Sequence, residues 1–167
     1  MSEATKPLKL FYCYANEDKP VRDALDSHLS GLKWQNLVEV WYDGQIIAGA
    51  EWEDEIDKSL ESADIVLLLV SAAFLNSKYC YGREMTRALQ KHEEGTARVI
   101  PIILRPVHWE NAPFSKLQIL PTGAKPVTSW TNADEAYKDI AGRLEVAVRE
   151  LQASRKTAEV WCREGGT

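Results

Sequence analysis

The chain has 167 residues, 45% hydrophobic and 27% charged, with a formal net charge of −5, so one domain with a sizeable core is expected. The negative charge argues against nucleic acid or an anionic membrane surface as the main partner. No apolar run approaches the roughly 20 residues that a membrane-spanning helix needs, and the amino-terminal residues lack the charged-then-apolar order of a secretory signal.

The apolar pattern alternates along the chain between strands and helices. The run at 65–70 is unbroken, which is typical of a strand buried on both faces of a parallel sheet. The helices are recognised by apolar residues three or four apart. The predicted strands are 8–14, 37–42, 64–70, 98–104 and 125–128, and the helices carry apolar stripes over 21–32, 52–60, 81–92 and 137–151.

Several residues refine this outline. Asn16 or Asp18 is expected to cap the first helix, and Asn132 the last. Pro101 cannot donate to a strand ladder, so the fourth strand is predicted to be interrupted or near an edge. His28 lies on the apolar stripe of the first helix and is interpreted as a packed histidine, because no second metal ligand lies at a matching spacing.

The ends of the chain and its cysteines indicate the limits of the domain and its redox environment. Residues 1–7 are predicted to be a polar tail, and 152–167, where the helical pattern is lost, a tail or linker. The three cysteines are odd in number and have no paired spacing, so they predict reduced thiols in a cytoplasmic protein. The acids at 51–55 suit the positive end of a helix dipole and are interpreted as structural, with no metal site.

Alternating strands and helices predict an α/β fold class. The expected architecture is a flavodoxin-like three-layer fold: a central five-stranded parallel sheet of order 2-1-3-4-5 with helices on both faces. In this order a crevice opens between the first and third strands, at the loops 14–18 and 71–79. Glu84 follows the second loop, so its carboxylate is expected near the crevice where open α/β sheets bind ligands.

Familiar catalytic motifs are missing from this crevice. There is no GxGxxG after the first strand, no GxxxxGK[ST] and no nucleophile elbow, which argues against a hydride-transfer enzyme, a P-loop nucleotidase and a serine hydrolase. A phosphoacceptor receiver domain would need an Asp at the end of the third strand, where this chain has Val70 and Ser71.

Five short motifs nevertheless follow one another in a recognisable order. They are FYCYA at 11–15, DGQIIAG at 43–49, a segment at 69–85 that ends in Glu84-Met85, RVIP at 98–101 and KPVTSW at 125–130. In order and spacing they resemble the boxes of a bacterial TIR (Toll/interleukin-1 receptor/resistance) domain, over about residues 8–151. The second motif resembles the loop called the BB loop in this family, and the third resembles the segment that carries its catalytic glutamate.

The resemblance implies cleavage of NAD+ at the nicotinamide–ribose bond, giving nicotinamide and ADP-ribose or a cyclic isomer. Nicotinamide leaves as a neutral ring, so the reaction needs no general acid; one carboxylate can stabilise the oxocarbenium charge that develops on the ribose. The resemblance assigns this role to Glu84, with NAD+ as substrate and no cofactor. It also implies substrate contacts by Tyr14, Ala15, Asn16, Asp43, Gln45, Phe74 and Tyr79, and self-association through Ile46, Ile47 and Gly49 of the BB loop.

The chain departs from the family pattern in the third motif. Tyr79 stands where many relatives have a Trp, and Glu84 follows Cys80 at four residues instead of three. The aromatic partner of the substrate is therefore Tyr79 or Tyr81.

Structural interpretations of the same residues stay open. Glu84 with Arg87 at i+3 has the spacing of a solvated ion pair. Asp43 suits a turn, Phe74 and Tyr79 suit the core, and the apolar loop 46–50 either binds a partner or folds onto the core.

Two functions follow from the resemblance. The first is an NAD+ hydrolase in bacterial immune signalling, activated when TIR domains associate. The second is a non-catalytic module that recruits other TIR domains, as a signalling scaffold or a virulence effector. Either one allows a fused or separate sensor domain as a further partner.

Overall fold

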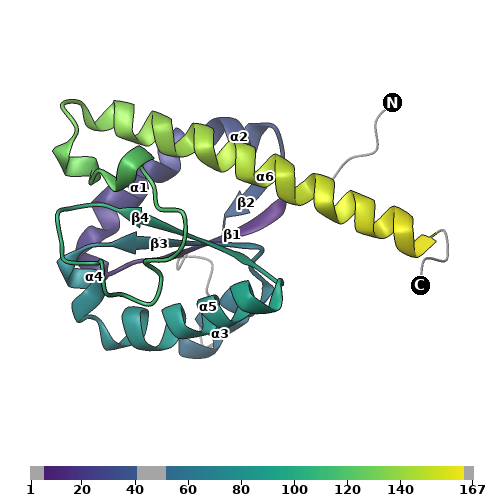
Figure 1. The fold of residues 1–167 in the computed structure, drawn as a ribbon, viewed down its shortest axis with the longest axis horizontal. Helices are drawn as coiled ribbons and strands as arrows, with labels where there is room; N and C mark the ends of the chain where they lie inside the picture. The colour runs from purple at the N-terminus through teal and green to yellow at the C-terminus, as the bar shows by residue number, and fades with distance from the viewer. Residues whose placement is uncertain (1–5, 41–51, 164–167) are drawn as a thin grey trace.

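The computed structural model describes residues 6–40 and 52–163, and their side chains except at 52–55, 79–80 and 155–163. Within these residues the fold is a mixed α/β arrangement with a parallel sheet between two layers of helices, as expected (Figure 1). The sheet order is β2-β1-β3-β4. Its strands are β1 (Leu8–Cys13), β2 (Val38–Val40), β3 (Ile65–Val70) and β4 (Arg98–Ile103).

The apolar run at 65–70 forms the centre of the sheet. All six residues of β3 are buried, because helices cover both of its faces. Successive side chains point to opposite faces, so Leu67 and Leu69 join one core cluster while Val66 and Leu68 join the other. Strand β1 pairs with β3 in parallel, with Cys13 opposite Leu68.

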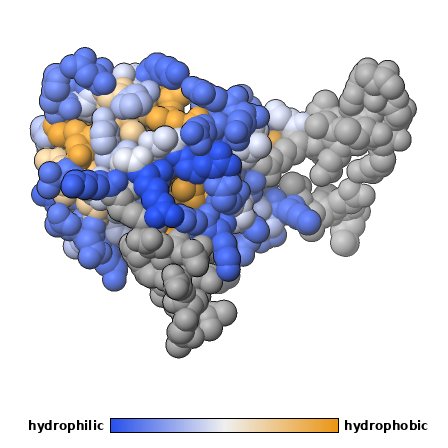
Figure 2. All heavy atoms as spheres, turned by 90° about the horizontal axis from the view of Figure 1, so that it is seen from below, coloured by the Kyte–Doolittle hydropathy of each residue, from blue (hydrophilic) through white to orange (hydrophobic). Residues whose placement is uncertain are grey.

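The helices divide between the two faces (Figure 1). On one face lie α1 (Lys19–His28), α2 (Ser30–Trp34) and α6 (Ala133–Arg163). On the other lie α3 (Trp52–Ser62), α4 (Ala72–Asn76) and α5 (Met85–Glu94). The view from below shows a mostly hydrophilic outer surface on this second layer, as expected for amphipathic helices (Figure 2).

The predicted fifth strand at 125–128 is wrong. Within the described residues the sheet has four strands, and a 3-10 helix, η5 (Val127–Ser129), occupies the end of the predicted segment. A single residue of this part of the described chain, Leu120, bridges to β4: its N–H donates to the Pro101 carbonyl, and its carbonyl accepts from Ile103 N, both at 2.9 Å. Pro121 and Pro126 have no N–H to donate to a strand ladder, and Thr128 N donates instead to the carbonyl of Leu104, just past β4, at 3.1 Å.

Pro101 does not interrupt β4, which runs unbroken as the edge strand of the described sheet. Its carbonyl faces Leu120. In a strand the nitrogen and carbonyl of one residue face the same side, so the proline nitrogen also points away from β3. The missing N–H therefore costs no bond between β3 and β4, which explains why proline is tolerated here.

The last helix is longer than its apolar stripe indicated. Asn132 Oδ1 accepts a hydrogen bond from Asp134 N at 2.9 Å, which confirms the predicted cap. Helix α6 then continues to Arg163, so 152–163 is helical and extends past the sheet (Figure 1). The division at 151 between domain and tail stays a prediction. None of the described helices combines the length and apolar character that crossing a bilayer would require.

His28 packs where α1 meets α6. Its Nε2 lies 3.1 Å from Asp134 Oδ1, and its ring centroid lies 5.1 Å from that of Tyr137. The side chain is about a third exposed, at 31%. It therefore contributes to a helix–helix contact, in line with the packed-histidine interpretation.

His92, in the last turn of α5, makes the stability of this fold depend on pH. Its Nδ1 accepts a hydrogen bond from Val99 N at 3.1 Å. Burial, with smaller contributions from Arg98 and Lys116, lowers the pKa of His92. A folded pKa below the unfolded one means that the unfolded chain binds the proton more readily, so stability is full above about pH 6.5 and is lost as the pH falls toward the folded pKa.

We expect the melting temperature to fall between about pH 7 and pH 5, and His92→Gln to make that fall shallower. The measurement is a series of thermal melts followed by circular dichroism. His108→Gln is the matched control, because the side chain of His108 is 77% exposed. Identical pH profiles for wild type and His92→Gln would contradict the assignment.

Candidate functional site

Glu84 lies at the carboxyl end of β1, at the position expected for the crevice. It is the last residue of a π-helix, η3 (Lys78–Glu84), which leads directly into α5. The residue is only 5% exposed. The thiol of Cys13, the last residue of β1, donates to Glu84 Oε1 with Sγ and Oε1 3.5 Å apart. The Glu84 carboxylate thus contacts a residue of β1 that lies 71 positions earlier in the sequence.

The alternative of a solvated pair between Glu84 and Arg87 is wrong. Arg87 turns instead toward α3, where its Nε and a terminal nitrogen bond both carboxylate oxygens of Glu61, at 2.5 and 2.7 Å. A further nitrogen lies 3.6 Å from Glu94. Arg87 is thus engaged by α3, while the Glu84 carboxylate is buried against Cys13 at the end of β1.

The π-helix accounts for the unusual spacing in the third motif. A π-helical turn closes with i→i+5 bonds and holds more residues than an α-helical turn. The four-residue step from Cys80 to Glu84 falls wholly within η3, so the wider turn accommodates the extra residue. The loop expected at 71–79 is correspondingly wrong: α4 and the start of η3 fill most of it.

The other residues implied by the first motif lie beside Cys13. Tyr14 is half-buried, with the Arg22 guanidinium 5.2 Å from its ring centroid. Ala15 is buried, and Asn16 is exposed at the start of a 3-10 helix, η1 (Asn16–Asp18). These three residues thus follow β1 directly, at the edge of the sheet where Cys13 contacts Glu84.

The remaining predicted site residues fall into two groups. Phe74 is fully buried, and its ring meets Tyr81 edge-on at 6.3 Å, so it is part of the core in this structure. The Tyr79 side chain is outside the described residues, which leaves the choice between Tyr79 and Tyr81 a prediction. Also outside the described residues are Asp43, Gln45, Ile46, Ile47 and Gly49 of the predicted BB loop.

A second buried acid at this edge was not predicted. Asp18 is 2% exposed, and its side chain does not cap the first helix as expected. It accepts a hydrogen bond from the Ser71 hydroxyl, and Arg105 Nε lies 3.7 Å from its other oxygen. This Asp18–Ser71–Arg105 cluster ties together the segments that follow β1, β3 and β4. Its sequence signal was slight: an acid just after one strand and a serine at the end of another.

Ser71 also begins α4, since its Oγ accepts from Phe74 N at 3.1 Å. Ser71→Ala removes both this cap and the donor to buried Asp18. We expect a loss of about 1–3 kcal/mol in unfolding free energy, measured by urea denaturation. Ser62→Ala, an exposed serine on α3, is the control and should change stability by less than about 0.5 kcal/mol. Equal losses in the two variants would contradict the cluster's role.

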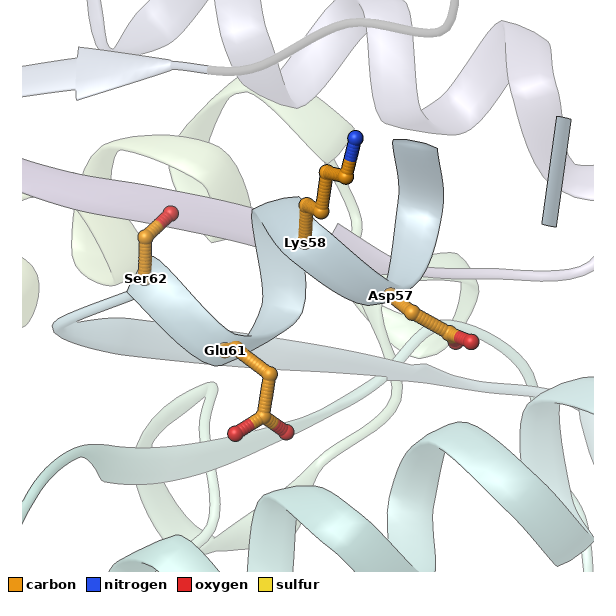
Figure 3. A pocket seen from close by; sticks show the side chains of 4 residues that line it. All are labelled: Asp57, Lys58, Glu61 and Ser62. Carbon is orange, nitrogen blue, oxygen red and sulfur yellow. The ribbon is translucent and has the colours of Figure 1, made fainter. Parts of the chain in front are cut away.

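A shallow hollow on α3 does not form a second site. It is lined by Asp57, Lys58, Glu61 and Ser62, whose side chains point in different directions (Figure 3). Its acids are already engaged, because Asp57 pairs with Arg83 and Glu61 with Arg87. The two ion pairs join α3 to η3, through Arg83, and to α5, through Arg87.

Sequence comparisons with known proteins indicate the family of this chain. A family model described as "TIR domain" matches residues 10–146. The chain is 46% identical over 141 residues to "Uncharacterized protein y4lF" of Sinorhizobium fredii (strain NBRC 101917 / NGR234), an alignment that covers 84% of this chain and 42% of the relative. The chain thus spans less than half the length of that curated relative.

Two solved structures are similar to the fold. The TIR domain of the Toll-related receptor TRR-2 from Hydra magnipapillata has a TM-score of 0.48 at 18% identity, covering 62% of this chain and 78% of that one. The TIR domains of the activated Roq1 resistosome, recognising the pathogen effector XopQ, have a TM-score of 0.45 at 16% identity, covering 87% and 84%. The match of the family model across most of the sequence is decisive: this chain belongs to the TIR domain family.

Proposed function

We propose that this TIR domain cleaves NAD+ at the nicotinamide–ribose bond and releases nicotinamide with ADP-ribose or a cyclic isomer. One observation carries the proposal: the Glu84 carboxylate is withdrawn from water at the carboxyl end of β1. Open α/β sheets bind their ligands at this edge. A ribose held there would meet a negative charge in surroundings of low polarity.

The chemistry needs little more than this charge. As the glycosidic bond lengthens, positive charge develops on the ribose while nicotinamide departs as a neutral ring. A carboxylate fixed beside the ribose stabilises that charge, and the interaction is stronger in a water-poor site than in bulk water. Tyr14, Ala15 and Asn16 border the nicotinamide and its ribose in this proposal. NAD+ is the substrate, and no resident cofactor is needed.

Association of TIR domains completes the proposal. We place activation in contacts between copies of this domain through the predicted BB loop. A sensor domain, fused or separate, would control those contacts in a cytoplasmic bacterial immune signalling pathway. The alternative is a module that uses the same contacts to recruit other TIR domains without catalysis.

Incubation of the purified chain with NAD+ separates the two functions. Nicotinamide is measured by chromatography over a range of protein concentrations, with and without a crowding agent. An enzyme activated by association should release nicotinamide faster than in proportion to protein concentration. Intact NAD+ at every concentration, together with tight binding between TIR domains, would contradict the enzyme and favour the module.

A further inference from the structure

We propose that Cys13 is a positioning residue, whose thiol holds the Glu84 carboxylate in the orientation that the reaction needs. The inference rests on the proposed function. It assigns a role to the thiol that differs from filling space in the core, and the two roles predict different kinetics.

The position of Cys13 is set by the sheet. It is the last residue of β1, a strand with neighbours on both sides, and it lies opposite Leu68 of β3. Its exposed fraction is 0%. Alternation along β1 directs Phe11 and Cys13 to the face covered by α3, α4 and α5. The thiol thus points from a rigid strand toward the helix that carries Glu84.

Glu84, by contrast, sits on a less regular element. It ends the π-helix η3, whose hydrogen bonding is looser than that of an α-helix. A buried carboxylate also needs hydrogen-bond donors, since water no longer supplies them. The S–H of Cys13 donates to one oxygen, Oε1, across 3.5 Å. A carboxylate accepts several bonds through its two oxygens, so this contact still allows the group to meet a ribose hydroxyl.

The opposing view treats Cys13 as a small apolar side chain in the core. In that view Cys13→Ala lowers stability through lost packing, whatever residue stands at position 84. If the thiol acts through the carboxylate, its effect must depend on Glu84. A kinetic double-mutant cycle measures that dependence directly.

The cycle combines Cys13→Ala with Glu84→Ala, which removes the acceptor, and measures steady-state nicotinamide release. Cys13→Ala alone should lower kcat about tenfold and leave KM for NAD+ within about twofold, because the lost bond orients the transition state and not the bound substrate. In the Glu84→Ala background, where no acceptor is left for the thiol, the same change should have no further effect. Cys13→Ser, which keeps a donor, should stay within about threefold of wild type.

The matched control is Val66→Ala, which removes buried apolar atoms from the same core cluster without touching a donor. It should lower stability and leave kcat unchanged at temperatures where the variant is folded. If Val66→Ala and Cys13→Ala lower kcat equally, or if Cys13→Ala acts equally with and without Glu84, the positioning role is overturned.

An infrared measurement tests the contact without any substrate. The S–H stretching band of Cys13 is the one missing from Cys13→Ser, and a donated hydrogen bond lowers its frequency. Glu84→Ala should move this band to higher frequency, and an unmoved band overturns the inference. Failure of the proposed function has a different signature: the band shifts as expected, but wild-type protein releases no nicotinamide at any concentration.

Discussion

Glu84→Gln is expected to lower the rate of nicotinamide release by at least about a hundredfold, the usual scale for losing one electrostatic stabiliser of a transition state. The amide keeps the shape of the side chain and can still accept a bond from Cys13, but it carries no charge to balance the developing positive charge on the ribose. The measurement is nicotinamide release at a protein concentration where wild type is active.

The control for this variant is Glu93→Gln on α5. Glu93 is exposed, and its ion pair with Lys116 is long at 3.8 Å. Its loss should leave the rate within about twofold of wild type, since exposed pairs contribute little. Both variants must first show wild-type circular dichroism. A Glu84→Gln protein that is folded and fully active would exclude the proposed role of the carboxylate.

Lys91→Met is expected to lower the free energy of unfolding by about 2–3 kcal/mol, because the ammonium makes bonds of the charge-assisted kind. Its Nζ donates to the carbonyls of Leu60, Glu61 and Ala63, at 2.8, 2.5 and 3.1 Å. These carbonyls close the last turn of α3, where helical partners run out and a positive charge suits the helix dipole.

Burial disfavours the charged form of Lys91: the residue is only 2% exposed, and burial lowers the pKa of its ammonium group. Methionine fills similar space but donates nothing, so it would leave the end of α3 without these donors. Urea denaturation followed by circular dichroism gives the loss. Lys116→Met, at an exposed lysine, should change stability by less than about 0.5 kcal/mol. A similarly small change at Lys91 would show that other donors satisfy the carbonyls.

Lys91 also illustrates what sequence patterns miss. It lies between Gln90 and His92 in α5. The sequence predicts the apolar stripe of this helix, yet a lysine on the same helix is expected to face solvent. Its burial depends on α3 ending just opposite, and periodicity within α5 contains no information about where another helix ends. Asp18 was missed for the same reason, because its true partner, Ser71, lies on another segment.

The sequence by itself determined the alternation of strands and helices, the order of the paired strands and the helix on which the site acid lies. The alternation and the helix follow from which side chains are apolar at a spacing of two or of three to four residues, and that information is local. The strand order follows from the few topologies that alternating strands and helices adopt. Residues 125–128 show its limit: their composition suits a strand, but whether a strand can join an edge depends on the backbone donors that reach it.

Only the tertiary structure decided that the Glu84 side chain turns away from Arg87 and meets the thiol at the end of β1. Two acceptors competed for the arginine, and Glu61 on α3 supplied the better geometry through a two-pronged bond. Pairings of this kind are set by packing between elements distant in the chain. The resemblance to the family's motif could therefore single out Glu84, while the packing of the sheet and helices decided which groups surround its carboxylate.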